Sequence, residues 1–278
     1  MKKSNLLLSY LLVLLLSSTN LIFAEDNNSI RIMPLGDSIT YDNRLSDIDD
    51  PRPTSVRTGY RSHLWYMLQN AGMNVDFVGS RSAGEKVTPP FDPDNEGHPG
   101  WKSFDIAENT YGYMAQHQPD IVLLHIGTND HGTFTGGVDD ILKEIHRYSQ
   151  DSGREIHVIV ALIIDRKTHD EIIPLFNDNL KRVIASHIIN GEKISMVDMY
   201  HDAGLTTADY ADNTHPLDSG YAKMARLWYN EIMKPYNARL SVFPYTLVDA
   251  LYIESIHIDQ SAKNIDIITE VPNTGITF

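Results

Sequence analysis

The stretch IRIMPLGDSIT, residues 30–40, joins a short apolar run directly to a glycine, an aspartate and a serine. A short apolar run that ends at a turn residue is typical of a buried strand in a parallel sheet. Gly36 allows a tight turn, and a helix-like stretch after it would leave free N–H groups beside Ser38. The sequence therefore predicts a strand whose carboxyl end presents a serine hydroxyl.

The alternation of apolar runs with longer amphipathic stretches continues along the chain. Further apolar runs occupy residues 75–78, 121–126, 157–164 and 194–199, and helical patterns occupy 59–70, 103–116, 138–151, 170–189 and 219–233. Strands that alternate with helices predict an α/β fold, a doubly wound, five-stranded parallel sheet flanked by helices. In such sheets the reacting groups gather at the carboxyl ends of the strands.

Two segments depart from this alternation. Residues 80–103 form a long loop with several prolines and glycines, and loops of this length in compact domains are often functional. Residues 252–259 and 264–269 alternate apolar and polar side chains with period two, which predicts two half-exposed strands. We therefore expect a main domain at 25–237 and a β-rich extension at 238–278, either a hairpin on that domain or the start of a further module.

Residues 1–24 have the layout of a secretory signal peptide. A basic start at Lys2 and Lys3 precedes a leucine-rich run at 6–16, and Ala24 precedes acidic residues. The apolar run is shorter than the ~20 residues of a spanning helix. We expect cleavage near Ala24, export to the periplasm or the medium, and no stable membrane anchor afterwards.

The charge and the cysteine content exclude several classes of protein. Removal of residues 1–24 leaves 254 of the 278 residues and changes the formal charge from −14 to −16, because two lysines leave. Such an acidic chain argues against nucleic acid and anionic membranes as partners. The sequence contains no cysteine, which excludes thiol chemistry and lipoprotein anchoring.

Three further stretches carry candidate functional groups at the end of an apolar run or in the loop after one. VDFVGS contains Gly79, LLHIGTND contains Asn129, and DNTHP places Asp212 three residues before His215. Together with Ser38, and in this order, they resemble the SGNH or GDSL hydrolase superfamily over residues 30 to about 234. The resemblance implies a flavodoxin-like, three-layer hydrolase domain.

Within that superfamily the chain is most similar to carbohydrate esterase family three. The resemblance rests on RIMPLGDSIT, GYR at 59–61, VDFVGS, EGHPGW at 96–101, LLHIGTND and HP followed by GYAKMA. Members of that family remove acetyl groups from xylan. The implied partner is an acetylated polysaccharide or another ester.

The chemistry of these residue types agrees with the resemblance. A serine hydroxyl needs a base beside it, His215 can take its proton, and Asp212 can orient the imidazole from three residues earlier. The resemblance assigns the oxyanion donors to the N–H groups of Ser38 and Gly79 and to the side-chain amide of Asn129. His201, beside Asp202, is a rival for the base.

The roles expected of the other polar residues are less specific. Asp37 is expected to hold the turn or to lie near substrate, and Glu96, His98 and Trp101 to form a wall of the cleft. His125 is expected to be a hydrogen-bonded core histidine. The acidic groups at 47–50 and 92–96 lack the spacing of a calcium loop and are expected to be solvated, so no metal and no cofactor are predicted.

Three functions remain open at this point. The first is a secreted serine esterase that deacetylates polysaccharide. The second is the same chemistry on another acyl group, as in lysophospholipases and thioesterases, and the third is a non-catalytic carbohydrate-binding protein. The loops at 41–57 and 80–103 are rich in Asp, Arg, Pro and Gly, which favours a small acyl group on a polar carrier.

Overall fold

The five apolar runs form five parallel strands of one sheet in the computed structural model, which describes residues 29–241, 252–259 and 264–270. The strands are β1 (Ile30–Gly36), β2 (Val75–Phe77), β5 (Ile121–His125), β6 (His157–Leu162) and β7 (Ile194–Asp198). They lie in the order β2-β1-β5-β6-β7, the 2-1-3-4-5 order of flavodoxin-like sheets. The predicted doubly wound parallel sheet is confirmed.

The long loop at 80–103 contributes two strands that the sequence pattern does not predict. These are β3 (Arg81–Ser82) and β4 (Asp94–Gly97), which pair antiparallel with each other. β4 also pairs parallel with the carboxyl end of β1, where Glu96 faces Leu35 in the register. The sheet therefore has seven strands within the described residues, and β4 returns the loop to the end of β1 where Ser38 follows.

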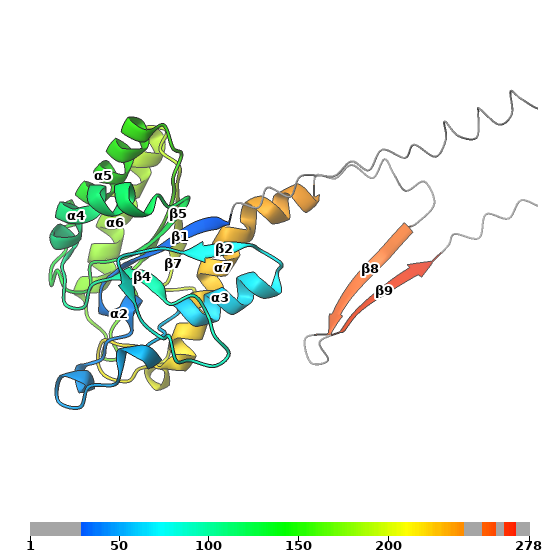
Figure 1. Ribbon diagram of the computed structural model, residues 1–278, viewed down its shortest axis with the longest axis horizontal. Helices are drawn as coiled ribbons and strands as arrows, with labels where there is room; N and C mark the ends of the chain where they lie inside the picture. The colour runs from blue at the N-terminus through cyan, green and yellow to red at the C-terminus, as the bar shows by residue number, and fades with distance from the viewer. Residues whose placement is uncertain (1–28, 242–251, 260–263, 271–278) are drawn as a thin grey trace, which may run out of the picture. The chain divides into compact units, whose positions relative to one another are not determined.

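Helices cover both faces of the sheet. They are α2 (Ser38–Tyr41), α3 (Arg61–Asn70), α4 (Ser103–His117), α5 (Gly136–Ser152), α6 (Ile172–Ile189) and α7 (Asp218–Ser241), with short 3₁₀ turns η1 (Leu45–Ile48), η2 (Thr54–Val56) and η3 (Thr207–Asp209). Figure 1 shows α4, α5 and α6 on one side of the sheet and α3 and α7 on the other.

The core lies between the sheet and these helices. On the α4–α6 side, alternate residues of β1 and β5, such as Met33, Leu35 and Val122, pack with apolar side chains of the three helices. On the other side, Tyr60 before α3 lies against Trp228 of α7, with ring centroids 5.8 Å apart. Burial on both faces explains why the strands read as nearly continuous apolar runs.

The contacts divide the chain between Glu231 and Ile232 into two units. In the second, β8 (Tyr252–Asp259) and β9 (Asn264–Glu270) form an antiparallel hairpin in which Ile256 is the partner of Ile267. The boundary at residue 237 stays a prediction, and the leader at 1–24 lies outside the described residues. In the described part of the chain, none of the helices has the length and apolar character required to cross a bilayer.

Candidate active site

Ser38 lies where β1 turns into α2, and the backbone there is tightly packed. A Cβ on Gly36 would lie 2.2 Å from the carbonyl oxygen of His125 in the neighbouring strand, so only glycine fits. Asp37 caps α2 by accepting a hydrogen bond from the N–H of Ile39 at 2.9 Å. The turn therefore fixes Ser38 as the first residue of the helix at the carboxyl end of the sheet.

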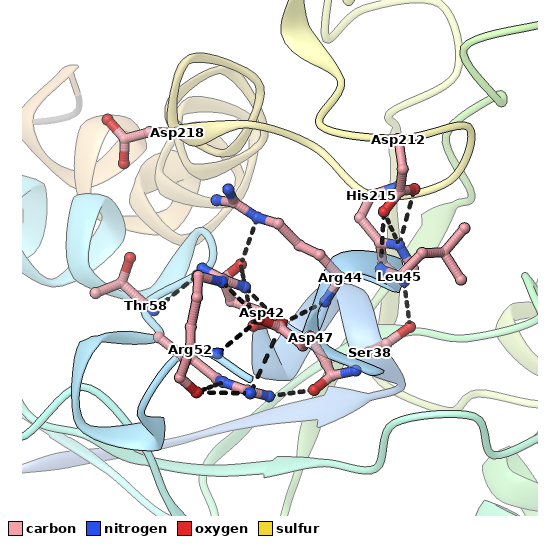
Figure 2. A network of polar contacts seen from close by, with 12 residues as sticks. Ser38, Asp42, Arg44, Leu45, Asp47, Arg52, Thr58, Asp212, His215 and Asp218 are labelled. Atoms are coloured by element: carbon pink, nitrogen blue, oxygen red, sulfur yellow. Dashed lines mark hydrogen bonds and ion pairs between the residues drawn. The ribbon is translucent and has the colours of Figure 1, made fainter. Parts of the chain in front are cut away.

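Ser38, His215 and Asp212 form one chain of hydrogen bonds, although 177 residues separate the serine from the histidine. The hydroxyl of Ser38 lies 2.9 Å from Nε2 of His215, and Nδ1 of His215 lies 2.9 Å from Oδ2 of Asp212. Figure 2 shows the three side chains in line, with His215 between the other two. The structure thus brings together the three residues that the sequence analysis selects.

The environment of Asp212 fixes the protonation of this chain. Burial by itself would raise the pKa of Asp212, but the N–H groups of Leu45, Thr214 and His215 donate to its carboxylate and hold the pKa below its ordinary value. An ionised carboxylate only accepts hydrogen bonds, so Nδ1 of His215 carries a proton. Nε2 is then free to accept the proton of Ser38.

An arginine that the sequence analysis misses supports the loop that carries His215. The guanidinium of Arg166 donates to Oγ1 of Thr214 at 2.6 Å and to the carbonyl oxygen of Thr128 at 3.1 Å. It also forms an ion pair with Asp170 at 3.1 Å. Arg166 therefore ties the loop after β5 to the loop of the histidine. Its place after an apolar run is the one signal in the sequence that could have selected it.

Gly79 and Asn129 follow β2 and β5, two of the strands that pair with β1. A Cβ on Gly79 would lie 2.2 Å from the carbonyl of Asn95, which explains the glycine, and its N–H has no acceptor among the described residues. The side-chain amide of Asn129 donates one of its two hydrogens to the carbonyl oxygen of Trp101 at 2.9 Å. Asn129 follows the strand whose end pairs with Gly36, next to Ser38, whereas Gly79 lies two residues after the partner of Ile32 and so short of the end of β1.

The three residues expected to line the cleft differ in their surroundings. Glu96 is fully buried and accepts hydrogen bonds from the N–H and the hydroxyl of Ser80. His98 contacts Glu96 through Nε2 at 2.6 Å, and its ring stacks on Trp101 with centroids 4.1 Å apart. Trp101 is half-buried, whereas Glu96 has no exposed surface through which to touch a ligand.

The charge state of Glu96 follows from these contacts. Burial raises the pKa of its carboxyl, but the hydrogen bonds from His98 and Ser80 outweigh burial, and the pKa lies below its ordinary value. Glu96 is therefore a carboxylate at neutral pH, held inside the protein by its hydrogen-bond donors.

Asp37 has the opposite balance. Burial raises the pKa of its carboxyl to about 7, against the hydrogen bond from Ile39, and the negative charge of Asp130 adds to the increase. Its side chain is fully buried, so it shapes the turn and has no surface for substrate. Asp130 itself accepts hydrogen bonds from the N–H and the hydroxyl of Ser103 at the start of α4, which is a structural role.

The two other histidines of interest lie away from the hydrogen-bond chain. His201 is exposed and pairs with Asp198 at 2.8 Å, not with the serine. His125 is fully buried, and neither ring nitrogen has a hydrogen-bond partner in the part of the chain that the structure describes. The expectation of a hydrogen-bonded His125 is therefore wrong. Burial lowers its pKa to about 4, so the ring is neutral at physiological pH.

In the loop at 41–57, beside the site, several charged side chains point into the protein. Arg52 donates to both Asp42 and Asp47, and the side chain of Asp47 is 1 % exposed. The expectation that the acidic group at 47–50 is solvated is wrong for Asp47, because its carboxylate holds this network. Figure 2 shows the network next to Leu45, whose N–H is hydrogen-bonded to Asp212.

Among the described residues, no group of three or more His, Cys, Asp or Glu side chains is arranged to hold a metal ion.

Comparisons with known proteins agree with this geometry. A model of the family GDSL-like Lipase/Acylhydrolase matches residues 32–228. A multidomain esterase from Ruminococcus flavefaciens is 28% identical over a match of 238 residues, and the match covers 73% of this chain and 28% of that protein. The chain therefore spans little more than a quarter of the length of that relative.

Two solved structures share the fold over their whole length. A carbohydrate esterase family 3 protein from Talaromyces cellulolyticus is 26% identical, with a TM-score of 0.63, and the match covers 75% of this chain and 99% of that one. A family 3 carbohydrate esterase from Clostridium thermocellum is 27% identical, with a TM-score of 0.63, and the match covers 76% of this chain and 99% of that one.

Proposed function

Because this chain belongs to the family of GDSL-like lipases and acylhydrolases, we propose that it is an exported esterase that removes acetyl groups from polysaccharide through an acyl-enzyme on Ser38. The observation that carries the proposal is the unbroken contact from Ser38 through His215 to Asp212. No other described histidine contacts the hydroxyl of this serine.

The contacts give each residue a role in two steps. His215 takes the proton of Ser38 as the serine oxygen bonds to the acetyl carbonyl carbon, and it returns that proton to the departing sugar hydroxyl. Water then attacks the acetyl-serine, His215 takes the water proton, and acetate leaves as the serine oxygen regains its hydrogen. Asp212 stabilises the imidazolium that forms twice in the cycle.

The negative oxygen of each tetrahedral intermediate needs donors that are in place beforehand. The N–H of Ser38, the N–H of Gly79 and the second amide hydrogen of Asn129 are the proposed donors. The placement of Ser38 and Asn129 after two adjacent strands, β1 and β5, supports this role, because rigid strands hold donors better than mobile loops. Loss of one such donor typically costs about 3 kcal/mol of transition-state stabilisation.

The substrate class is proposed from the relatives and from the leader. Carbohydrate esterases of family 3 are among the similar solved structures, and the sequence resembles that family in EGHPGW and neighbouring motifs. A signal peptide at 1–24 would deliver the enzyme to polymers outside the cell. Because the curated relative is a much longer multidomain esterase, partners and polymer attachment of the whole protein belong to the proposal as well.

A longer acyl group is the second candidate, and one observation favours it. Asp42 and Asp47 of the loop at 41–57 are buried, whereas apolar side chains of the same loop are exposed: Leu45 by 50%, Ile48 by 73% and Val56 by 44%. Figure 2 shows Leu45 beside His215. An apolar rim of this kind fits the acyl chain of a lysophospholipid or a thioester.

A series of esters with the same aryl leaving group and acyl chains of increasing length decides between the two. We expect kcat/KM to be highest for acetyl and to fall for longer chains, with release of acetate from acetylated xylan. Each methylene buried in an accommodating site contributes about 0.8 kcal/mol, so a lipase-like site that buries two or more of the added methylenes would favour octanoyl over acetyl by more than about tenfold. Octanoyl turnover above acetyl turnover, abolished by Leu45→Ser, would support the second candidate and contradict the first.

A further inference from the structure

We propose that Glu96 is a positioning residue that holds Asn129, one of the proposed oxyanion donors. It reaches Asn129 through the 96–101 segment, which is residues 96–101 with the sequence EGHPGW. The inference deepens the proposed function and rests on it, because it assigns the oxyanion role to the same donors. It differs from the expectation that Glu96 lines the cleft, since Glu96 is fully buried.

The first arm of the arrangement runs from Glu96 to Ser80, the residue after Gly79. Oε2 of Glu96 accepts the N–H of Ser80 at 2.6 Å, and Oε1 accepts the hydroxyl of Ser80 at 2.7 Å. Two bonds from one carboxylate to one residue fix both the position and the rotation of that residue. The N–H and the hydroxyl of Ser80 therefore hold the carboxylate of Glu96 in one orientation, with Oε1 turned to His98.

The packing around Gly79 makes this restraint effective. A Cβ on Gly79 would lie 2.2 Å from the carbonyl of Asn95 and 2.8 Å from the nitrogen of Glu96, so the glycine backbone lies directly against β4. Glu96 is thus both the hydrogen-bond anchor of Ser80 and part of the wall behind Gly79.

The second arm runs from Glu96 to Asn129 through two aromatic rings. Oε1 of Glu96 lies 2.6 Å from Nε2 of His98, and the His98 ring lies between Trp101 and Tyr113, with centroids at 4.1 and 5.4 Å. The N–H of Trp101 donates to the carbonyl of His98, and the carbonyl of Trp101 accepts the amide of Asn129 at 2.9 Å. The ring orientation set by Glu96 therefore sets the acceptor that orients Asn129.

The replacement Glu96→Gln tests the proposal with little change in volume. The wild-type carboxylate only accepts, whereas an amide places two N–H donors against Ser80 or against His98. We expect kcat on the best ester to fall about 10- to 100-fold, with KM nearly unchanged, because misplaced donors weaken the transition state more than the bound substrate. The variant should remain folded in a thermal melt.

Asp92→Asn is the matched control. Asp92 lies in the same loop and uses its two oxygens to accept the N–H groups of Phe77 and Asp94, at 2.9 and 3.1 Å, but it touches neither Ser80 nor His98. The same change from carboxylate to amide should leave kcat near the wild-type value. Equal losses of kcat in Glu96→Gln and Asp92→Asn would overturn the proposal, because a general weakening of the loop would explain both.

A double-mutant cycle with Asn129→Ala separates positioning from simple destabilisation. If Glu96 acts through Asn129, Asn129→Ala costs less in the Glu96→Gln protein than in the wild type. If Asn129→Ala lowers kcat by the same factor in the Glu96→Gln protein as in the wild type, the two residues act independently and the proposal is contradicted.

Labelling with an alkyl fluorophosphonate gives the same comparison without an ester substrate. The serine oxygen bonds to phosphorus as fluoride leaves, and His215 takes the serine proton. A slower labelling rate in Glu96→Gln, with Asp92→Asn at the wild-type rate, supports the role of Glu96 even if acetyl esters prove not to be substrates. Equal labelling rates in Glu96→Gln and the wild type would overturn it.

Discussion

Replacing Ser38 by alanine is expected to abolish ester hydrolysis while the protein stays folded. The hydroxyl is the one group at the site that can form the acyl-enzyme, and removal of a catalytic serine in a comparable Ser–His–Asp site costs about 10⁶ in kcat. The change removes a single oxygen atom, and no apolar contact of the core is lost. We expect a stability change of about 1 kcal/mol or less. Steady-state hydrolysis and a thermal melt measure the two effects.

Ser82→Ala is the matched control for this variant. Ser82 lies in β3 in the neighbouring loop, is exposed, and its hydroxyl also makes one hydrogen bond, to Glu85 at 2.8 Å. Its loss should leave the rate unchanged. A folded Ser38→Ala protein that hydrolyses esters at the wild-type rate would end the serine mechanism.

Replacing His215 by alanine is expected to cost nearly as much as the loss of Ser38. Without the imidazole the serine keeps its proton at neutral pH and is a weak nucleophile. The double variant Ser38→Ala with His215→Ala should be scarcely slower than either single variant, because the residues act as a unit. The rates of the three variants on one ester measure this.

The chain supplies a close control for His215 in His201. His201 pairs with Asp198 through Nδ1 at 2.8 Å and with the same three-residue spacing, but no serine of the described chain is hydrogen-bonded to its other nitrogen. His201→Ala should retain full activity. Inactivation by His201→Ala and not by His215→Ala would show that the base is wrongly assigned.

The sheet could be predicted from the sequence because its strands are buried on both faces. Apolar runs such as residues 121–126 are expected only in the core, and each run is followed by a polar residue or a glycine at the carboxyl edge of the sheet. β4 could not be predicted in this way, because Asp94–Gly97 contains no apolar side chain. It is held by backbone pairing with β1 and by the hydrogen bonds of Asn95 and Glu96.

The residues of the site could be selected from the sequence, but the contacts between them could not be predicted from it. Motif spacing brings out Ser38, Asp212 and His215, whose contact depends on the strand order and is set only by the fold. Composition misled the interpretation of the loop at 41–57, because a list of charges does not show whether they point outward. Arg52 gathers Asp42 and Asp47 inside the loop and leaves apolar side chains on its surface.

The role of Glu96 shows a similar limit. A glutamate in a loop next to a tryptophan reads as part of a cleft wall, and nothing in EGHPGW shows that its carboxylate turns to Ser80. The link depends on β4 lying beside β1, which the pattern does not predict. The signal peptide, the domain boundary at residue 237 and the polymer substrate stay predictions.

The acyl-enzyme itself tests the central claim most directly. The protein is mixed with an aryl acetate, whose good leaving group favours accumulation of the intermediate, quenched in acid during turnover, digested and analysed by mass spectrometry. The account predicts one acetyl group on the peptide that contains Ser38 and none on that peptide in Ser38→Ala. Sustained hydrolysis with the acetyl group on another residue, and with Ser38→Ala equally active, would contradict it.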